Sequence, residues 1–123
     1  MVRTTKTISQ LEFNTAFDSA ATGVYTTIDS TLVTAGLSVT DFFKQKLDCS
    51  FIHVKNTAVS SKNITFKAGV QFRSGIGDLV VAVPASGERM VQLESARFKQ
   101  ADGALYADFE SGFTGSIGSF SLK

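Results

Sequence analysis

The sequence is poor in the residues that most often carry chemistry or cross-links. It has one cysteine, Cys49, one histidine, His53, one proline and no tryptophan in 123 residues. A single cysteine excludes an intrachain disulfide and a cysteine-based zinc cluster, and a single histidine excludes a zinc site built from several histidines. The net charge is only +1, so the basic excess typical of nucleic-acid-binding proteins is missing as well. The composition therefore argues against several functional classes and names none.

Long hydrophobic runs are also missing. The longest aliphatic run, residues 79–83, is far shorter than the ~20 residues that cross a bilayer. The first ten residues begin with basic character but have no apolar segment behind it, so no secretory signal is predicted. We therefore expect a protein made in the cytoplasm, with a reduced Cys49 and no membrane partner. The length, without a linker or an internal repeat, predicts one domain over residues 1–123.

Alternation of apolar and polar residues is the clearest pattern present. It runs through residues 48–55, 63–68 and 78–83, whereas no sustained helical period is found. In residues 78–83 the alternate positions Val80 and Ala82 are apolar too, and a strand with two apolar faces is expected at the centre of a sheet or under a partner. Pro84 then ends this strand, because proline cannot donate to a strand ladder.

Turn signals separate the alternating segments. Asp102-Gly103 is a favoured hairpin dipeptide and predicts that a strand at 96–100 pairs with one at 104–109. Short strands at this spacing indicate an all-β protein, an antiparallel β-sandwich of Ig-like or jelly-roll-like type with about seven to eight short strands. The N-terminal third is less regular, so residues 1–17 are predicted to form an irregular arm or an edge strand.

The catalytic and ligand-binding patterns that we tested are weak. Cys49 and His53 fall on one face of a predicted strand, but four residues span ~13 Å there, and a nucleophile needs its base at ~3 Å. Asp108 and Glu110 also share a face without the spacing of a calcium loop. The glycines of residues 75–77 precede a strand and not a helix, so they do not form a phosphate cradle. We expect no enzymatic activity, cofactor, metal or small-molecule substrate.

Phenylalanine is the residue type in excess, with 11 copies. Several of them lie in or beside turn-like segments, where an exposed ring marks a protein contact. Together with apolar and basic residues of the N-terminal segment they make a candidate interface. Its predicted members are Val2, Arg3, Ile8, Leu11, Phe13, Phe17, Phe42, Phe43 and Phe113.

The C-terminal half, residues 66–123, carries a series of turn and core motifs that resembles one family. The motifs are Lys-Ala-Gly at 67–69, Gly-Asp-Leu at 77–79, Val-Pro-Ala-Ser-Gly at 83–87, Leu-Glu-Ser-Ala-Arg-Phe-Lys-Gln at 93–100, the Asp-Gly turn at 102–103 and Thr-Gly at 114–115. In this order they are similar to small β-sandwich proteins encoded among the head genes of tailed bacteriophages and prophages, the capsid decoration proteins. The match covers about half of the chain, and residues 1–45 carry none of it.

The resemblance implies a virion structural protein that lies on the outside of the capsid and clamps neighbouring subunits of the major capsid protein. It also implies an oligomer, with a homotrimer as one form, and an N-terminal segment that contacts the shell. Related chains serve as tail, neck or head-fibre base parts, so another place in the virion remains an alternative. A carbohydrate-binding or adhesive β-sandwich is a further alternative, although such sites stack sugars on tryptophan or tyrosine and only Tyr25 and Tyr106 are present.

Overall fold

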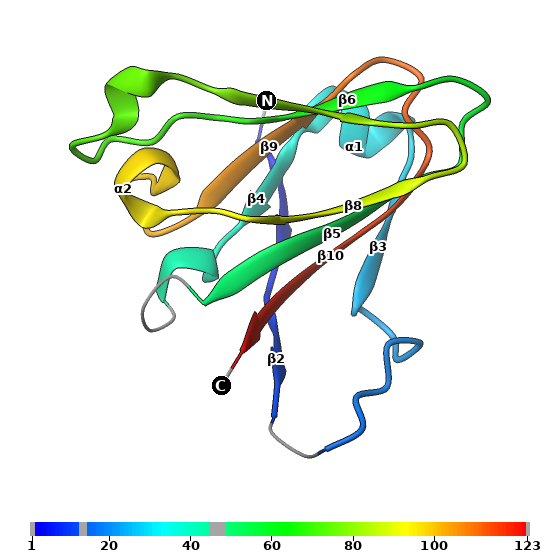
Figure 1. Cartoon of the computed structure of the whole chain (residues 1–123), viewed down its shortest axis with the longest axis horizontal. Helices are drawn as coiled ribbons and strands as arrows, with labels where there is room; N and C mark the ends of the chain where they lie inside the picture. The colour runs from blue at the N-terminus through cyan, green and yellow to red at the C-terminus, as the bar shows by residue number, and fades with distance from the viewer. Residues whose placement is uncertain (1, 13–14, 45–48, 123) are drawn as a thin grey trace.

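Two mixed β-sheets pack face to face in the computed structural model, which describes residues 2–12, 15–44 and 49–122 (Figure 1). The first sheet has the order β1–β4–β9–β6–β7 and consists of β1 (Thr4–Lys6), β4 (Leu37–Val39), β9 (Leu105–Phe109), β6 (Lys62–Phe66) and β7 (Leu79–Val83). The second consists of β2 (Ser9–Leu11), β10 (Gly115–Leu122), β5 (Ser50–Asn56) and β8 (Glu88–Gln92), with β3 (Tyr25–Ile28) beside β2 along β10. The sandwich-like architecture is as predicted, with ten strands in the described residues instead of seven or eight.

The core lies between the two sheets and follows the predicted alternation. β5 buries Ile52 and Val54, and β6 buries Ile64 and Phe66, while the side chains between them point away from the core. Short helices and turns close the ends of the sandwich, namely α1 (Ser30–Ala35), α2 (Ser95–Phe98) and the 3₁₀ helices Phe42–Lys44 and Ser74–Ile76. Burial of these apolar side chains is the main stabilising contribution.

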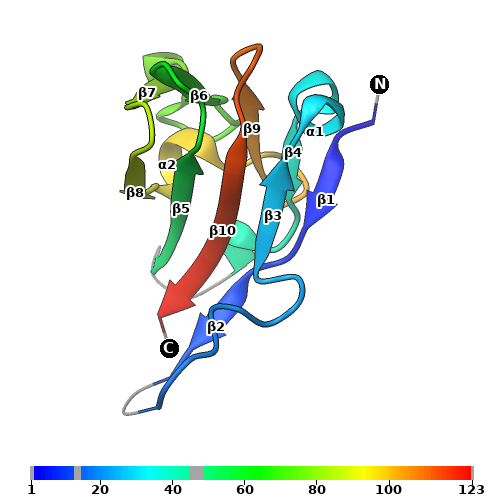
Figure 2. The ribbon, with the colours of Figure 1, turned by 90° about the vertical axis from the view of Figure 1, so that its right-hand side faces the viewer.

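The N-terminal segment is part of both sheets, where it forms two edge strands, so of the two predicted forms the edge strand is present and the irregular arm is not. β1 pairs with β4 and β2 pairs with β10, both in parallel, and Figure 2 shows the segment running down one side of the sandwich. These parallel pairs make the sheets mixed, whereas a purely antiparallel sandwich was predicted. Lys6 is the last residue of β1, and its buried ammonium donates to the carbonyl oxygens of Gly23 and Val24 and to Thr26 Oγ1. Burial lowers the pKa of Lys6, and these three oxygens hold its ammonium in place.

Two further expectations are corrected. Residues 95–98 form the helical turn α2, because Phe98 turns into the core, so no hairpin joins 96–100 to 104–109. The Asp-Gly turn itself is present: Gly103 has a φ of +86° and the Ala104 N–H donates to Asp102 Oδ1. The strand β7, which was expected at the centre of a sheet or under a partner, lies at the edge of the first sheet.

Candidate functional site

The outer surface of the second sheet, away from the core, gathers large apolar side chains from several elements. Phe51 and His53 alternate with the core residues of β5, and Phe120 of β10 lies directly opposite Phe51. We call the apolar group on this surface the aromatic patch. It consists of Leu11, Phe17, Tyr25, Phe51, Met90 and Phe120.

Phe120 is the centre of the aromatic patch. The rings of Phe17, Tyr25 and Phe51 surround it, with centroids 5.9, 5.7 and 5.4 Å from its own. Aromatic pairs of this kind contribute roughly 0.5–1.5 kcal/mol each beyond the area that they bury. The rim of the patch stays in water, since Phe17 is 39% exposed and Met90 is 64% exposed. The patch therefore combines a packed centre with apolar surface that a partner can cover.

Gly118 leaves room for two of the rings above β10. It stands between Tyr25 of β3 and His53 of β5 in the strand register. A Cβ atom at this position would lie 2.7 Å from the ring of Phe120 and 2.9 Å from that of Tyr25. The absence of a side chain here therefore leaves the space that both rings occupy.

A chain of hydrogen bonds borders the aromatic patch. The Tyr25 hydroxyl lies 2.7 Å from His53 Nδ1, and His53 Nε2 lies 2.7 Å from Glu88 Oε1. A carboxylate only accepts, so Nε2 carries the hydrogen and the Nδ1 of a neutral ring accepts from the tyrosine. Burial and the charge of Glu88 raise the pKa of Tyr25, which keeps the donating hydroxyl protonated. The chain fixes the orientation of the tyrosine ring across three strands.

Two shallow hollows lie side by side on this surface. One, of about 200 Å³, lies within the aromatic patch, and the other, of about 230 Å³, extends toward Cys49 and Leu122. Phe51 and Met90 line both, so the hollows are adjacent. Each is smaller than the pockets that ordinarily enclose small ligands, which begin at about 300 Å³.

The structure brings two of the predicted interface residues, Leu11 and Phe17, into the aromatic patch. Val2 is exposed ahead of β1, and Ile8 packs against the core. Arg3 is half-buried on the opposite surface of the sandwich, where it forms a 2.6 Å ion pair with Asp108 and lies over the ring of Tyr106. Phe13 lies outside the described residues.

Three predicted interface residues are corrected. Phe42, Phe43 and Phe113 are all buried in the core. Their turn-like neighbourhoods suggested exposure, but Phe42 lies in a 3₁₀ helix that turns its ring inward, and Phe113 packs edge-on against Phe109 at 5.5 Å. They stabilise the fold and are not available on the surface of the chain.

Four members of the aromatic patch were not predicted as interface residues, namely Tyr25, Phe51, Met90 and Phe120. A signal was present for Phe51 alone, because it occupies an alternate position of a strand whose other face carries Ile52 and Val54. The residues that alternate with Phe120 are the polar Ser119 and Ser121, so alternation does not mark it. Alternation does not reveal which strands pair. It is the pairing of β3, β10, β5 and β8 that brings these side chains together.

The other chemical groups tested in the sequence are either apart from one another or engaged in contacts that support the fold. Cys49 and His53 line different hollows, and the carboxylate of Glu110 accepts from the Asn63 N–H. Among the residues that the structure describes, no three His, Cys, Asp or Glu side chains gather as a metal site would require. In the same part of the chain, no helix has the length and apolar character needed to cross a membrane.

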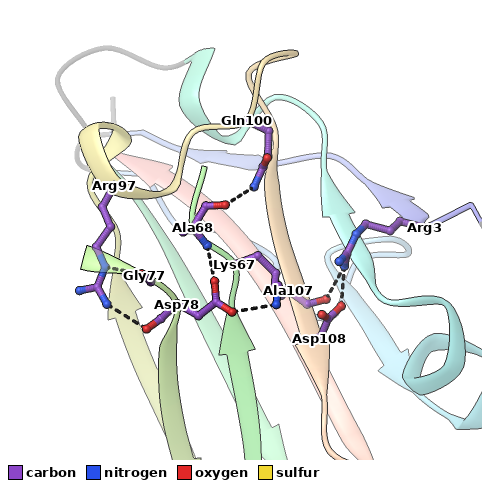
Figure 3. A network of polar contacts seen from close by, with 9 residues as sticks. All are labelled: Arg3, Lys67, Ala68, Gly77, Asp78, Arg97, Gln100, Ala107 and Asp108. Atoms are coloured by element: carbon purple, nitrogen blue, oxygen red, sulfur yellow. Dashed lines mark hydrogen bonds and ion pairs between the residues drawn. The ribbon is translucent and has the colours of Figure 1, made fainter. Parts of the chain in front are cut away.

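Asp78 organises the loop between β6 and β7 on the other side of the molecule (Figure 3). Its carboxylate accepts from Lys67 Nζ and from the Ala68 N–H, both at 2.7 Å. Arg97 of α2 donates to the carbonyl oxygens of Gly77 and Asp78, which ties the loop to the helix. The hydrogen bonds from Lys67 and from the Ala68 N–H lower the pKa of Asp78, and the bond to Asp78 raises the pKa of Lys67. The network holds the loop in place.

Comparison of the chain with protein-family models, with curated proteins and with solved structures finds no match. The functional assignment therefore depends on the geometry of the surface and on the sequence motifs.

Proposed function

We propose that the protein is a non-enzymatic structural protein of a phage virion, which decorates the capsid exterior and stabilises it by clamping neighbouring subunits of the major capsid protein. The observation that carries the proposal is the aromatic patch, an apolar surface on a rigid sheet that includes Leu11 and Phe17. The resemblance of residues 66–123 to decoration proteins supports the nature of the partner.

The physical chemistry of the aromatic patch suits a clamp. Its rings are held in place by Phe120 and by the Tyr25–His53–Glu88 chain, so little side-chain entropy is lost when a partner covers them. Aromatic residues and methionine are the types enriched at protein interfaces. Each contact contributes modestly, and many copies bound to one shell add up.

Co-sedimentation with purified expanded capsids of the parent virus tests the proposal. Phe17→Ala removes a ring from the rim of the aromatic patch, and Phe72→Ala makes the same change in the β6–β7 loop, at a side chain that is 89% exposed. We expect the first variant to bind at least about tenfold more weakly, which corresponds to ~1.4 kcal/mol. The second should bind as the unmodified protein does.

Two results contradict the proposal. One is equal binding by both variants, and the other is a failure of the unmodified protein to sediment with capsids. Binding to a glycan array in place of capsids favours the carbohydrate-binding alternative. Thermal unfolding of both variants checks that a loss of binding does not come from a loss of fold.

A further inference from the structure

The edge of the first sheet carries a strand of unusual composition for its position. β7, Leu79–Val83, pairs with β6 on one side and, within the described residues, has no strand on the other (Figure 2). It contains no charged residue. Proteins ordinarily protect an exposed edge strand by making it short, by charge, by proline or by a bulge, since its free backbone groups otherwise pair with another chain.

The other outer strands of the two sheets show such protection. β1 and β2 have three residues each, and β1 directs the charged Lys6 inward. β8 has five residues but carries Glu88 and Arg89. Only β7, among the outer strands described, combines five residues with a wholly apolar sequence.

Both surfaces of β7 are apolar as well. Val83 is buried and Leu79 and Val81 are half-buried toward the core, as expected for an edge strand. On the outer surface, however, Val80 is 56% exposed although its partner on β6 is the polar Thr65, and the exposed Ala82 is paired with the polar Asn63. A strand with two apolar surfaces is typical of the interior of a sheet. The sequence of β7 is therefore that of a central strand at an edge position.

We propose that β7 is a central strand in a dimer, in which it pairs antiparallel with β7 of a second copy about a two-fold axis at Val81. Leu79 then lies opposite Val83 of the second copy, and Val80 lies opposite Ala82. The two five-stranded first sheets become one continuous sheet.

The charges near the ends of β7 and the small net charge of the chain favour a second copy as the partner of this edge. In this register Asp78 falls opposite Pro84, so no like charges face each other at the ends of the strand, and the carboxylate of Asp78 is already neutralised by Lys67. Pro84 ends the pairing because it has no N–H. With a net charge of +1, long-range repulsion between copies is small. The two-fold pairing predicts a dimer, in contrast to the homotrimer implied by the family resemblance.

Five paired residues bury less than the ~800 Å² per partner of a standard stable interface. We therefore expect a weak dimer, with a dissociation constant in the range of about 10 µM to about 1 mM. Sedimentation velocity over that concentration range measures it with the full chain alone, without capsids. The result is thus independent of the proposed function.

The variant Val80→Lys places two ammonium groups diagonally across the two-fold axis, and we expect the dissociation constant to rise at least about tenfold. Val59→Lys makes the same change at a loop valine that is 99% exposed, and it should dimerise as the unmodified protein does. Val80→Thr, which keeps the branched shape, should also dimerise. Hydrogen exchange adds a second readout, since β7 amides should gain protection as the protein concentration rises.

The proposal is overturned if the unmodified protein remains a monomer up to about 1 mM. It is equally overturned if Val80→Lys and Val59→Lys have the same dissociation constant. A monomer whose β7 amides become protected only on capsids would assign the edge to a strand of the shell and not to a second copy.

Discussion

At the scale of single residues, the surface that we assign to binding depends on a glycine. Gly118 leaves room for Tyr25 and Phe120, and a methyl group at this position would overlap both rings. We expect Gly118→Ala to lower the free energy of unfolding by ~1–3 kcal/mol, the usual effect of overpacking. Chemical denaturation measures the change.

Gly75→Ala is the matched control for this substitution. A Cβ atom at Gly75 meets nothing within 4 Å. Its expected effect is between no change and a gain of ~1 kcal/mol, because alanine restricts the unfolded chain. Equal effects of the two substitutions would contradict the steric role of Gly118.

The Asp78 network makes a prediction about pH. Hydrogen bonds from Lys67 and the Ala68 N–H lower the pKa of Asp78 below its ordinary value of 3.8. The unfolded chain therefore takes up the proton first, so this stabilisation is complete above pH 3.8 and is lost as the pH falls through the lower, folded-state pKa. Asp78→Asn removes the charge at every pH.

The stability difference between the unmodified protein and Asp78→Asn should thus shrink as the pH falls from about 7 to about 2.5. Urea denaturation at several pH values measures it. A difference that stays constant over this range would show that the charge of Asp78 does not stabilise the fold.

The fate of individual phenylalanines was only partly predictable. Phe17 lies at a surface as expected, but Phe42 and Phe113, which look similar in the sequence, are buried. A turn-like neighbourhood indicates that the backbone reaches the surface. The direction of a side chain depends on which elements pack over it, and that information is not local.

At the scale of elements, the N-terminal strands are structural. β1 contributes Lys6, whose ammonium is bonded to Gly23, Val24 and Thr26, and it extends the first sheet through β4. Removing residues 2–6 leaves the buried carbonyl oxygen of Val24 without this donor, at a cost of roughly 1–3 kcal/mol, and adds the loss of strand pairing.

We therefore expect this deletion to lower Tm by well over about 5 °C. Val2→Ala, in front of the strand, should leave Tm unchanged because that side chain is exposed. Thermal unfolding followed by circular dichroism decides the point. An unchanged Tm for the deleted protein would support an irregular arm, the other form that the sequence allowed for this segment.

Elements with clear alternation were predicted well and the others were not. β5, β6 and β7 were found within a residue or two of their predicted positions. Residues 96–100 were predicted as a strand, but residues 95–98 form a helical turn, because Phe98 has to reach the core while Arg97 reaches the β6–β7 loop. Alternation locates a strand in the sequence but does not say which strands pair with it. The edge position of β7 and the parallel pairs of β1 and β2 could therefore not be predicted from it.

At the scale of the whole molecule, the two proposed surfaces are separate. The aromatic patch lies on the outer surface of the second sheet, and β7 lies at the edge of the first. A dimer through β7 leaves both aromatic patches free. Two linked patches bind a repeating surface more tightly than one, since the second contact forms at a high effective concentration.

Electron cryo-microscopy of expanded capsids saturated with the protein shows which surface of the protein faces the shell. We expect density on the outer surface of the shell in which the second sheet faces the capsid and the shell covers Phe17 and Met90. Bare capsids, or bound protein with the aromatic patch turned toward solvent, would rule out the proposed capsid contact.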